Sequence, residues 1–145
     1  MRKLPLKNGY YEIPYKDGII SKKGLYKDGL MEGYWEHFHT TGKLYSKGTY
    51  IEGYRYGDWV YYGVNGCMTS KGAYVDGKQH GYWEEYHYNG KLHCRGTYKN
   101  GAEEGVWEWF DSDGTPSVYK TFVNGELCGY CTDYYYDSYE EYFYF

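Results

Sequence analysis

Residues 72–96 read GAYVDGKQHGYWEEYHYNGKLHCRG, and the same landmarks return 24 residues away in either direction. Glycines recur at this spacing in three columns: Gly9, Gly33, Gly57, Gly81, Gly105 and Gly129; Gly29, Gly53, Gly77, Gly101 and Gly125; and Gly18, Gly42, Gly66, Gly90 and Gly114. Aromatic residues form further columns: Trp35, Trp59, Trp83 and Trp107; Phe38, Tyr62, Tyr86, Phe110 and Tyr134; and Tyr26, Tyr50, Tyr74, Tyr98 and Phe122. A fixed period of this kind is typical of a repeat protein.

Each repeat contains a β-hairpin signal. Asn89-Gly90 is flanked by strand-like segments, and this dipeptide tolerates the two positive φ angles of a two-residue type I′ turn. Such a turn pairs Tyr88 with Lys91, and it also implies the pairs His87–Leu92, Glu85–Cys94, Trp83–Gly96 and Gly81–Tyr98. The equivalent turns are Asn65-Gly66, Asp113-Gly114 and Thr41-Gly42. The connection from Lys99 to Glu104 is expected to be longer and polar.

This register places large rings opposite glycines. Trp83 then covers the bare backbone of Gly96, as Trp35 covers Gly48 and Trp59 covers Gly72, an arrangement that stabilises adjacent strands. We expect these glycines and the four tryptophans, Trp107 included, to form the structural spine. Because side chains alternate along a strand, the tyrosine-rich face lies on the other side.

Hairpins placed side by side predict an all-β fold, an elongated single-layer antiparallel sheet of about six repeats. Residues 1–23 form a degenerate N-terminal capping repeat, in which Pro14 suits an edge strand. Residues 24–130 form the repeat array. Residues 131–145 are acidic and aromatic, and they either cap the sheet or bind a partner.

Composition narrows the classes of function. Aromatic residues make up 23% of the chain, so rings packed over their neighbours must supply the stability of a single-layer sheet. The formal net charge of −4 does not predict a nucleic-acid partner, and acidic residues dilute the basic and aromatic mixture around Tyr86 and Arg95. No apolar run is long enough for a membrane span or a secretory signal, so we expect a cytoplasmic protein.

No constellation of reactive residues suggests an enzyme. Cys128-Gly-Tyr-Cys131 is a C-x-x-C motif, but a structural zinc needs four converging ligands, and Cys94 lies more than a repeat away. The histidines occupy different repeat positions, and no glycine-rich loop precedes a helix. We therefore expect no catalytic residue, no cofactor and no metal.

The columns G-x-W-x-x-[YF]-x-x-x-G-x-L and G-x-Y-x-x-G-x-x-x-G, seen from Gly81 to Gly105, resemble MORN repeats. They are closest to the variant form of bacterial and viral proteins, whose members are often described as antitoxins. The resemblance covers roughly residues 5–130. It implies a sheet of hairpins that serves as a scaffold or a protein-binding module, with some relatives touching phospholipids.

The sequence thus predicts a non-enzymatic module for protein binding, either a scaffold or a neutralising inhibitor, because large exposed apolar patches mark partner sites. The expected contact residues are aromatic: Tyr34, Phe38, Tyr62, Tyr82, Tyr86, Tyr88, Phe110, Tyr136, Tyr139 and Phe143. The alternative is a membrane-surface adaptor that binds anionic phospholipid through basic residues near the N-terminus: Arg2, Lys3, Lys7, Lys22 and Lys23. A homodimer is also compatible with the sequence, whereas nucleic acid is not expected as a partner.

Overall fold

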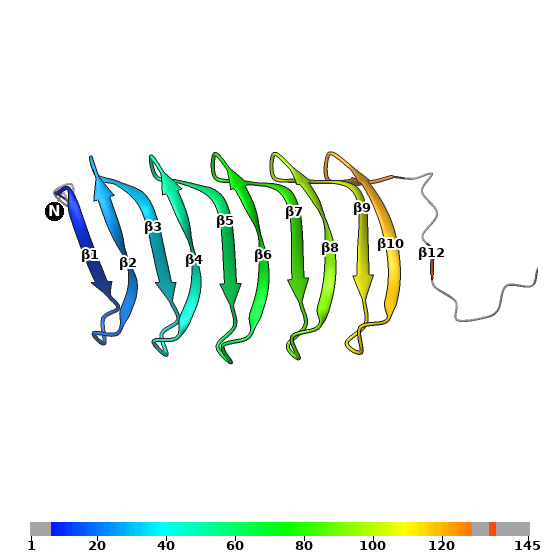
Figure 1. The fold of residues 1–145 in the computed structure, drawn as a ribbon, viewed down its shortest axis with the longest axis horizontal. Helices are drawn as coiled ribbons and strands as arrows, with labels where there is room; N and C mark the ends of the chain where they lie inside the picture. The colour runs from blue at the N-terminus through cyan, green and yellow to red at the C-terminus, as the bar shows by residue number, and fades with distance from the viewer. Residues whose placement is uncertain (1–6, 129–133, 136–145) are drawn as a thin grey trace, which may run out of the picture.

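A computed structural model describes residues 7–128 and 134–135 of the chain. They form one antiparallel sheet, in which consecutive strands are neighbours from β1 to β11 and β12 pairs with β10 (Figure 1). The strands are β1 (Gly9–Pro14), β2 (Ile20–Lys27), β3 (Leu30–Phe38), β4 (Leu44–Ile51), β5 (Tyr54–Tyr62), β6 (Met68–Val75), β7 (Lys78–Tyr86), β8 (Leu92–Lys99), β9 (Ala102–Phe110), β10 (Pro116–Val123), β11 (Glu126–Leu127) and β12 (Tyr134–Tyr135). This confirms the predicted fold class, and within these residues no helix could span a membrane.

The two kinds of connection are the reverse of the sequence prediction. The connection around Gly101 is not long, because Lys99 pairs with Ala102 and only Asn100 and Gly101 lie between them. Both have positive φ, 53° and 87°, which is the type I′ geometry. The same two-residue turn joins every hairpin to the next: Asp28-Gly29, Glu52-Gly53, Asp76-Gly77 and Asn124-Gly125.

The turn at Asn89-Gly90 has three residues, not two. The N–H of Gly90 donates to the carbonyl of His87, and the N–H of His87 donates to the carbonyl of Lys91. Gly90 has a positive φ but Asn89 does not, which is a type I turn followed by a bulge. The sequence prediction was wrong because an Asn-Gly pair fits both turns, so the dipeptide alone does not fix the loop length.

A β-bulge next to this turn restores the predicted register further along the hairpin. Tyr86 pairs with Leu92 and Glu85 with Cys94, which leaves His93 as the extra residue. The predicted pairs Tyr88–Lys91 and His87–Leu92 are therefore wrong. The predicted pairs Glu85–Cys94, Trp83–Gly96 and Gly81–Tyr98 are confirmed.

One side of the sheet, which we call the tryptophan face, holds the core. Its buried hydrophobic residues are Tyr26, Trp35, Tyr50, Trp59, Tyr61, Tyr74, Trp83, Cys94 and Trp107. Trp35 and Trp59 are 0% exposed, and neighbouring rings meet edge to face along the row, as Tyr74 meets Trp83 at a centroid distance of 5.3 Å. The elongated sheet thus has a continuous aromatic core in a single layer.

Each tryptophan covers a glycine, but not the predicted one. The ring of Trp83 lies over Gly72 on the preceding strand and not over Gly96, which Trp107 covers. In the same way Trp59 covers Gly48 and Trp35 covers Gly24, so the predicted coverage of Gly48 by Trp35 and of Gly72 by Trp59 was also wrong. Trp83 pairs with both glycines in register, so register alone did not decide toward which strand the ring leans.

A second irregularity explains the direction of the rings. Between β6 and β7, Gly72 pairs with Trp83 but Ala73 pairs with His80, so Gly81 and Tyr82 are extra residues on β7. The Nε1–H of Trp83 donates to the carbonyl of Ala73 at 3.0 Å. Equivalent bonds run from Trp35 to Leu25, Trp59 to Thr49 and Trp107 to Thr97. A backbone carbonyl beside the irregularity therefore has a hydrogen-bond donor inside the core, the indole N–H.

Candidate functional site

The opposite side of the sheet, which we call the open face, carries a row of charged side chains. In register across the strands the row reads Glu12, Lys23, Glu36, Lys47, Val60, Lys71, Glu84, Arg95 and Glu108. Its members come from one position of each strand, because the hairpin repeat brings that position to the same level of the sheet. Acidic and basic residues alternate along the row except at Val60.

Each cation of the row lies over an aromatic ring of the following hairpin. The distances from the charged group to the ring centroid are 5.2 Å for Lys23 over Phe38, 6.0 Å for Lys47 over Tyr62, 5.9 Å for Lys71 over Tyr86 and 5.3 Å for Arg95 over Phe110. Cation–π contacts of this kind are worth about 0.5–1 kcal/mol at exposed sites. The contacts hold one hairpin to the next on the side that lacks the tryptophans.

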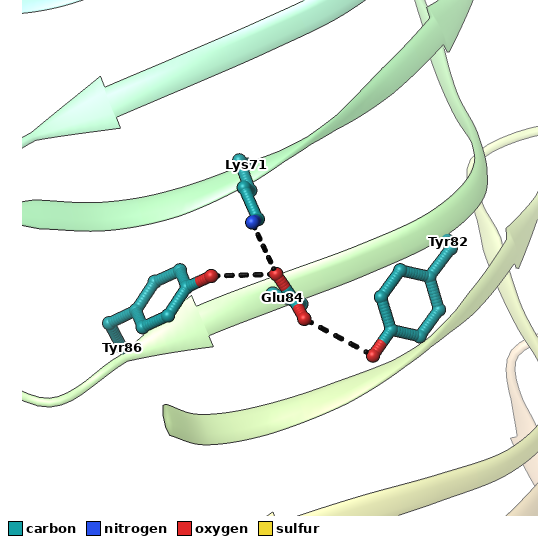
Figure 2. Close-up of polar contacts among 4 residues, drawn as sticks. All are labelled: Lys71, Tyr82, Glu84 and Tyr86. Atoms are coloured by element: carbon teal, nitrogen blue, oxygen red, sulfur yellow. Dashed lines mark hydrogen bonds and ion pairs between the residues drawn. The ribbon is translucent and has the colours of Figure 1, made fainter. Parts of the chain in front are cut away.

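Within the row, Glu84 contacts the side chains of Lys71, Tyr82 and Tyr86 (Figure 2). Its Oε2 lies 2.8 Å from the Nζ of Lys71 and accepts a hydrogen bond of 2.6 Å from the hydroxyl of Tyr86. Its Oε1 accepts a bond of 3.3 Å from Tyr82. Lys23 and Glu36 form the same pair at 2.9 Å, and Arg95 pairs with Glu108.

These contacts change the ionisation of both partners. Partial burial raises the pKa of Glu84, but the bonds from Lys71 and Tyr86 outweigh it, so that the pKa of the carboxyl lies below its usual value. The hydrogen bond to Glu84 raises the pKa of Lys71. Both groups therefore stay charged through the neutral pH range, and the positive and negative charges of this face balance locally.

The third hairpin, formed by β5 and β6, interrupts the row. Val60 stands where the second, fourth and fifth hairpins carry Glu36, Glu84 and Glu108. Asp58 likewise stands where the neighbouring hairpins carry Tyr34 and Tyr82. The smaller side chains leave a groove of about 360 Å³, lined by Asp58, Trp59, Val60, Lys71, Gly72, Tyr82 and Glu84.

This groove places an apolar surface beside charged side chains. Val60 offers an apolar surface, while Asp58, Lys71 and Glu84 supply both signs of charge beside it. The ring of Tyr82 is 53% exposed and stands at the groove with its hydroxyl bonded to Glu84. An apolar or aromatic side chain fits such a site, with polar neighbours that fix its orientation.

The predicted contact residues divide into three groups. Tyr34, Phe38, Tyr62, Tyr82, Tyr86 and Phe110 lie along the open face. Tyr34 and Tyr82 are exposed, whereas the other four are partly covered under their cations. Tyr88 is 83% exposed but lies in the turn between β7 and β8, away from the row. Tyr136, Tyr139 and Phe143 lie outside the described residues.

The predicted spine residues lie on the tryptophan face, where Trp35, Trp59, Trp83 and Trp107 are 0–3% exposed and Gly48, Gly72 and Gly96 lie under indole rings. The ionisable side chains of His37 and Arg55 also lie on this face. His37 packs against Trp35 and Trp59, and the Arg55 guanidinium lies 4.9 Å from the Trp59 centroid. Burial, followed by the charges of Arg55 and Lys22, lowers the pKa of His37 to about 4.

The sequence did not predict the groove or the cation–π contacts along the row. The columns describe what the repeats share, whereas the groove arises from two residues that depart from their columns, Asp58 and Val60. The column Lys23, Lys47, Lys71 and Arg95 has the same 24-residue period and was also visible in the sequence. Comparing the exceptions to each column would therefore have indicated the third hairpin.

No curated protein matches the chain. Among solved structures, one titled "Crystal Structure of TarM" is 14% identical with a TM-score of 0.41, over 71% of this chain and 20% of that one. This chain therefore spans about a fifth of the length of that protein. Residues 31–52, 79–100 and 103–124 each match the family model described as MORN repeat variant, so three of the repeats are of the MORN variant type.

Proposed function

We propose that this protein is a non-enzymatic module that binds another protein through the open face of its sheet, with the groove at Val60 as the anchoring site. MORN repeats are commonly associated with binding to proteins or to membrane lipids. The observation that supports a protein as the partner is the groove itself. It is an apolar depression in an otherwise regular row of charged side chains. Side chains that fill such pockets dominate the binding energy of protein interfaces.

The balance of charge on this face favours a protein over a lipid surface. Anionic membranes attract clusters of basic residues, each worth about 1 kcal/mol near the surface. Here Lys23, Lys71 and Arg95 are each paired with a glutamate, so the row presents alternating signs. Alternating charges steer and orient a folded partner with a complementary surface.

By binding its partner, the module would serve one of the two roles predicted from the sequence. As a scaffold, the module holds a partner without altering its activity. As an antitoxin-like inhibitor, it covers the active surface of the partner and abolishes its activity. An activity assay of the captured partner, alone and in the complex, separates these two roles.

The test replaces one groove residue by the residue that other hairpins carry there. Val60→Glu fills the groove and completes the row, since Glu36, Glu84 and Glu108 occupy that position elsewhere. Val106→Glu is the matched control, because Val106 is 58% exposed, lies two hairpins away and undergoes the same chemical change. The tagged full chain and both variants are expressed in the native host, and captured proteins are quantified by mass spectrometry.

We expect the wild type and Val106→Glu to retain one stoichiometric protein, and Val60→Glu to lose at least about 90% of it, since a buried charge at an interface costs several kcal/mol. Equal capture by all three would contradict the groove as the anchor. No captured protein, together with salt-sensitive sedimentation on anionic vesicles, would contradict protein binding and favour the membrane-surface adaptor.

A further inference from the structure

Three side chains able to bind a metal converge on the tryptophan face of the fourth hairpin, β7 and β8. The ligand atoms of Glu85, His93 and Cys94 all lie within 4.8 Å of one another. Glu85 and Cys94 are a cross-strand pair, and His93 is the extra residue of the bulge beside them. Without the bulge, alternation along β8 would direct His93 to the other face.

The other hairpins serve as internal comparisons for this cluster. The same three positions hold Ile13, Ser21 and Lys22 in the first hairpin, His37, Tyr45 and Ser46 in the second, Tyr61, Thr69 and Ser70 in the third, and Trp109, Ser117 and Val118 in the fifth. In the described hairpins, then, only the fourth fills all three positions with metal-binding side chains. The fold does not require these residues, because the third hairpin forms the same pairs and the same bulge with a tyrosine, a threonine and a serine.

We propose that Glu85, His93 and Cys94 form a binding site for a divalent transition metal, with Zn²⁺ the best fit. A thiolate, an imidazole and a carboxylate are all ligands of zinc, and three protein ligands leave the fourth tetrahedral position to water or to an external group. Ligand atoms of a tetrahedral zinc lie about 3.3–3.8 Å apart. Closing the observed separation needs side-chain movement of about 1 Å, which rotation of the half-buried His93 and Glu85 can provide.

The surroundings of the cluster favour metal binding. Cys94 is 4% exposed, so the thiol is shielded from water. The ring of His87 lies 4.5 Å from that of His93, and its Nε2–H donates to the carbonyl of Phe110 at 2.8 Å. A second imidazole therefore stands beside His93, held in one orientation.

The test is a titration of the reduced, metal-free full chain with Co²⁺. Cobalt bound to a thiolate gives a charge-transfer band in the near ultraviolet, and Zn²⁺ displaces it. The test variants are Cys94→Ser and His93→Thr, which install the residues of the third hairpin, Ser70 and Thr69. The controls are Cys67→Ser, which alters an exposed cysteine of another column, and a double Cys128→Ser, Cys131→Ser variant, which removes the C-x-x-C motif.

We expect one Co²⁺ per chain, loss of the band in Cys94→Ser, and binding at least about tenfold weaker in His93→Thr, because losing even an outer partner of a metal ligand typically costs about 10–100-fold in affinity. Both control variants should bind as the wild type does. Unfolding in urea without metal verifies that the variants are folded. If Cys94→Ser does not fold, His93→Thr still tests the site, because it keeps the thiol of Cys94. The site would be overturned if the wild type gave no band or if folded Cys94→Ser kept the band. Unchanged binding in His93→Thr, or loss of binding in the double control variant, would also overturn it.

Discussion

The two faces of this sheet repeat with different fidelity. On the tryptophan face, a ring covers a glycine in four successive steps, from Trp35 over Gly24 to Trp107 over Gly96. On the open face, the row of alternating charge breaks at Val60, and a groove opens there. Regular positions are those on which the fold depends, whereas the exceptions occur where folding leaves the side chain free to vary.

This difference matters because a single-layer repeat sheet has no second layer to stabilise it. Each hairpin contacts mainly its neighbours, so every step of the aromatic core must be complete. The open face contributes only contacts that are individually weak, ion pairs and cation–π contacts at partly exposed positions. The predictions below test this division of roles, from the largest expected effect to the smallest.

The largest effect is expected at the glycines of the tryptophan face. A Cβ added at Gly72 would lie 2.2 Å from the ring of Trp83, so Gly72→Ala must displace the indole. The loss then approaches that of removing the ring, about 3–5 kcal/mol of unfolding free energy, measured by urea denaturation. Gly63→Ala is the control, because its Cβ would meet mainly the end of the flexible Asn65 side chain. A similar small loss in both variants would contradict the role of the glycine column.

A smaller effect on the same face depends on pH. His37 has a pKa near 4 in the folded protein, below the unfolded value of 6.5, so the unfolded state binds more protons between these values. Stability should therefore fall as the pH is lowered from 7 to 5, by about 1 kcal/mol after allowance for partial exposure. His37→Tyr, which installs the residue found at Tyr61, should lack this part of the fall. If thermal melts showed the same fall in stability between pH 7 and pH 5 for the wild type and the variant, the prediction would be refuted.

The smallest effect is expected on the open face. Glu84→Gln keeps the size of the side chain and removes its charge, and the loss of the pair with Lys71 should cost less than about 1 kcal/mol. Because the pKa of Glu84 is lowered on folding, its contribution is present above the unfolded pKa and disappears as the pH falls through the lower, folded pKa. Urea melts at low and high salt measure the loss. A loss of several kcal/mol that salt does not reduce would place Glu84 in the core.

The sequence was sufficient to predict the repeat, the antiparallel hairpins and the pairing of Trp83 with Gly96. These depend on local patterns, because the 24-residue period and the alternation of side chains act within and between adjacent strands. It also indicated Tyr82 and Tyr86 as residues of the face opposite the tryptophans. The structure adds that both bond to Glu84, and that Tyr82 borders the groove.

The details that the sequence did not predict depend on irregularities of the ladder. Asn89-Gly90 and Asn100-Gly101 are the same dipeptide, yet one lies in a three-residue turn and the other in a two-residue turn. The bulge that carries His93 and the extra pair Gly81 and Tyr82 change which residues share a face and toward which strand a ring leans. The bulge at His93 has no residue type of its own. The irregularity on β7 does have a glycine of positive φ, Gly81, but the glycine column alone does not show how the strands pair around it, so strand pairing in three dimensions was needed to place both.

The most direct measurement compares two adjacent residues of β7, one on each face. Tyr82 is 53% exposed on the open face, and Trp83 is 2% exposed on the tryptophan face. We predict that Trp83→Ala lowers the free energy of unfolding in urea by about 3–5 kcal/mol, and that Tyr82→Ala lowers it by less than about 1 kcal/mol. Equal losses, or a larger loss for Tyr82→Ala, would contradict the assignment of folding to one face and of binding to the other.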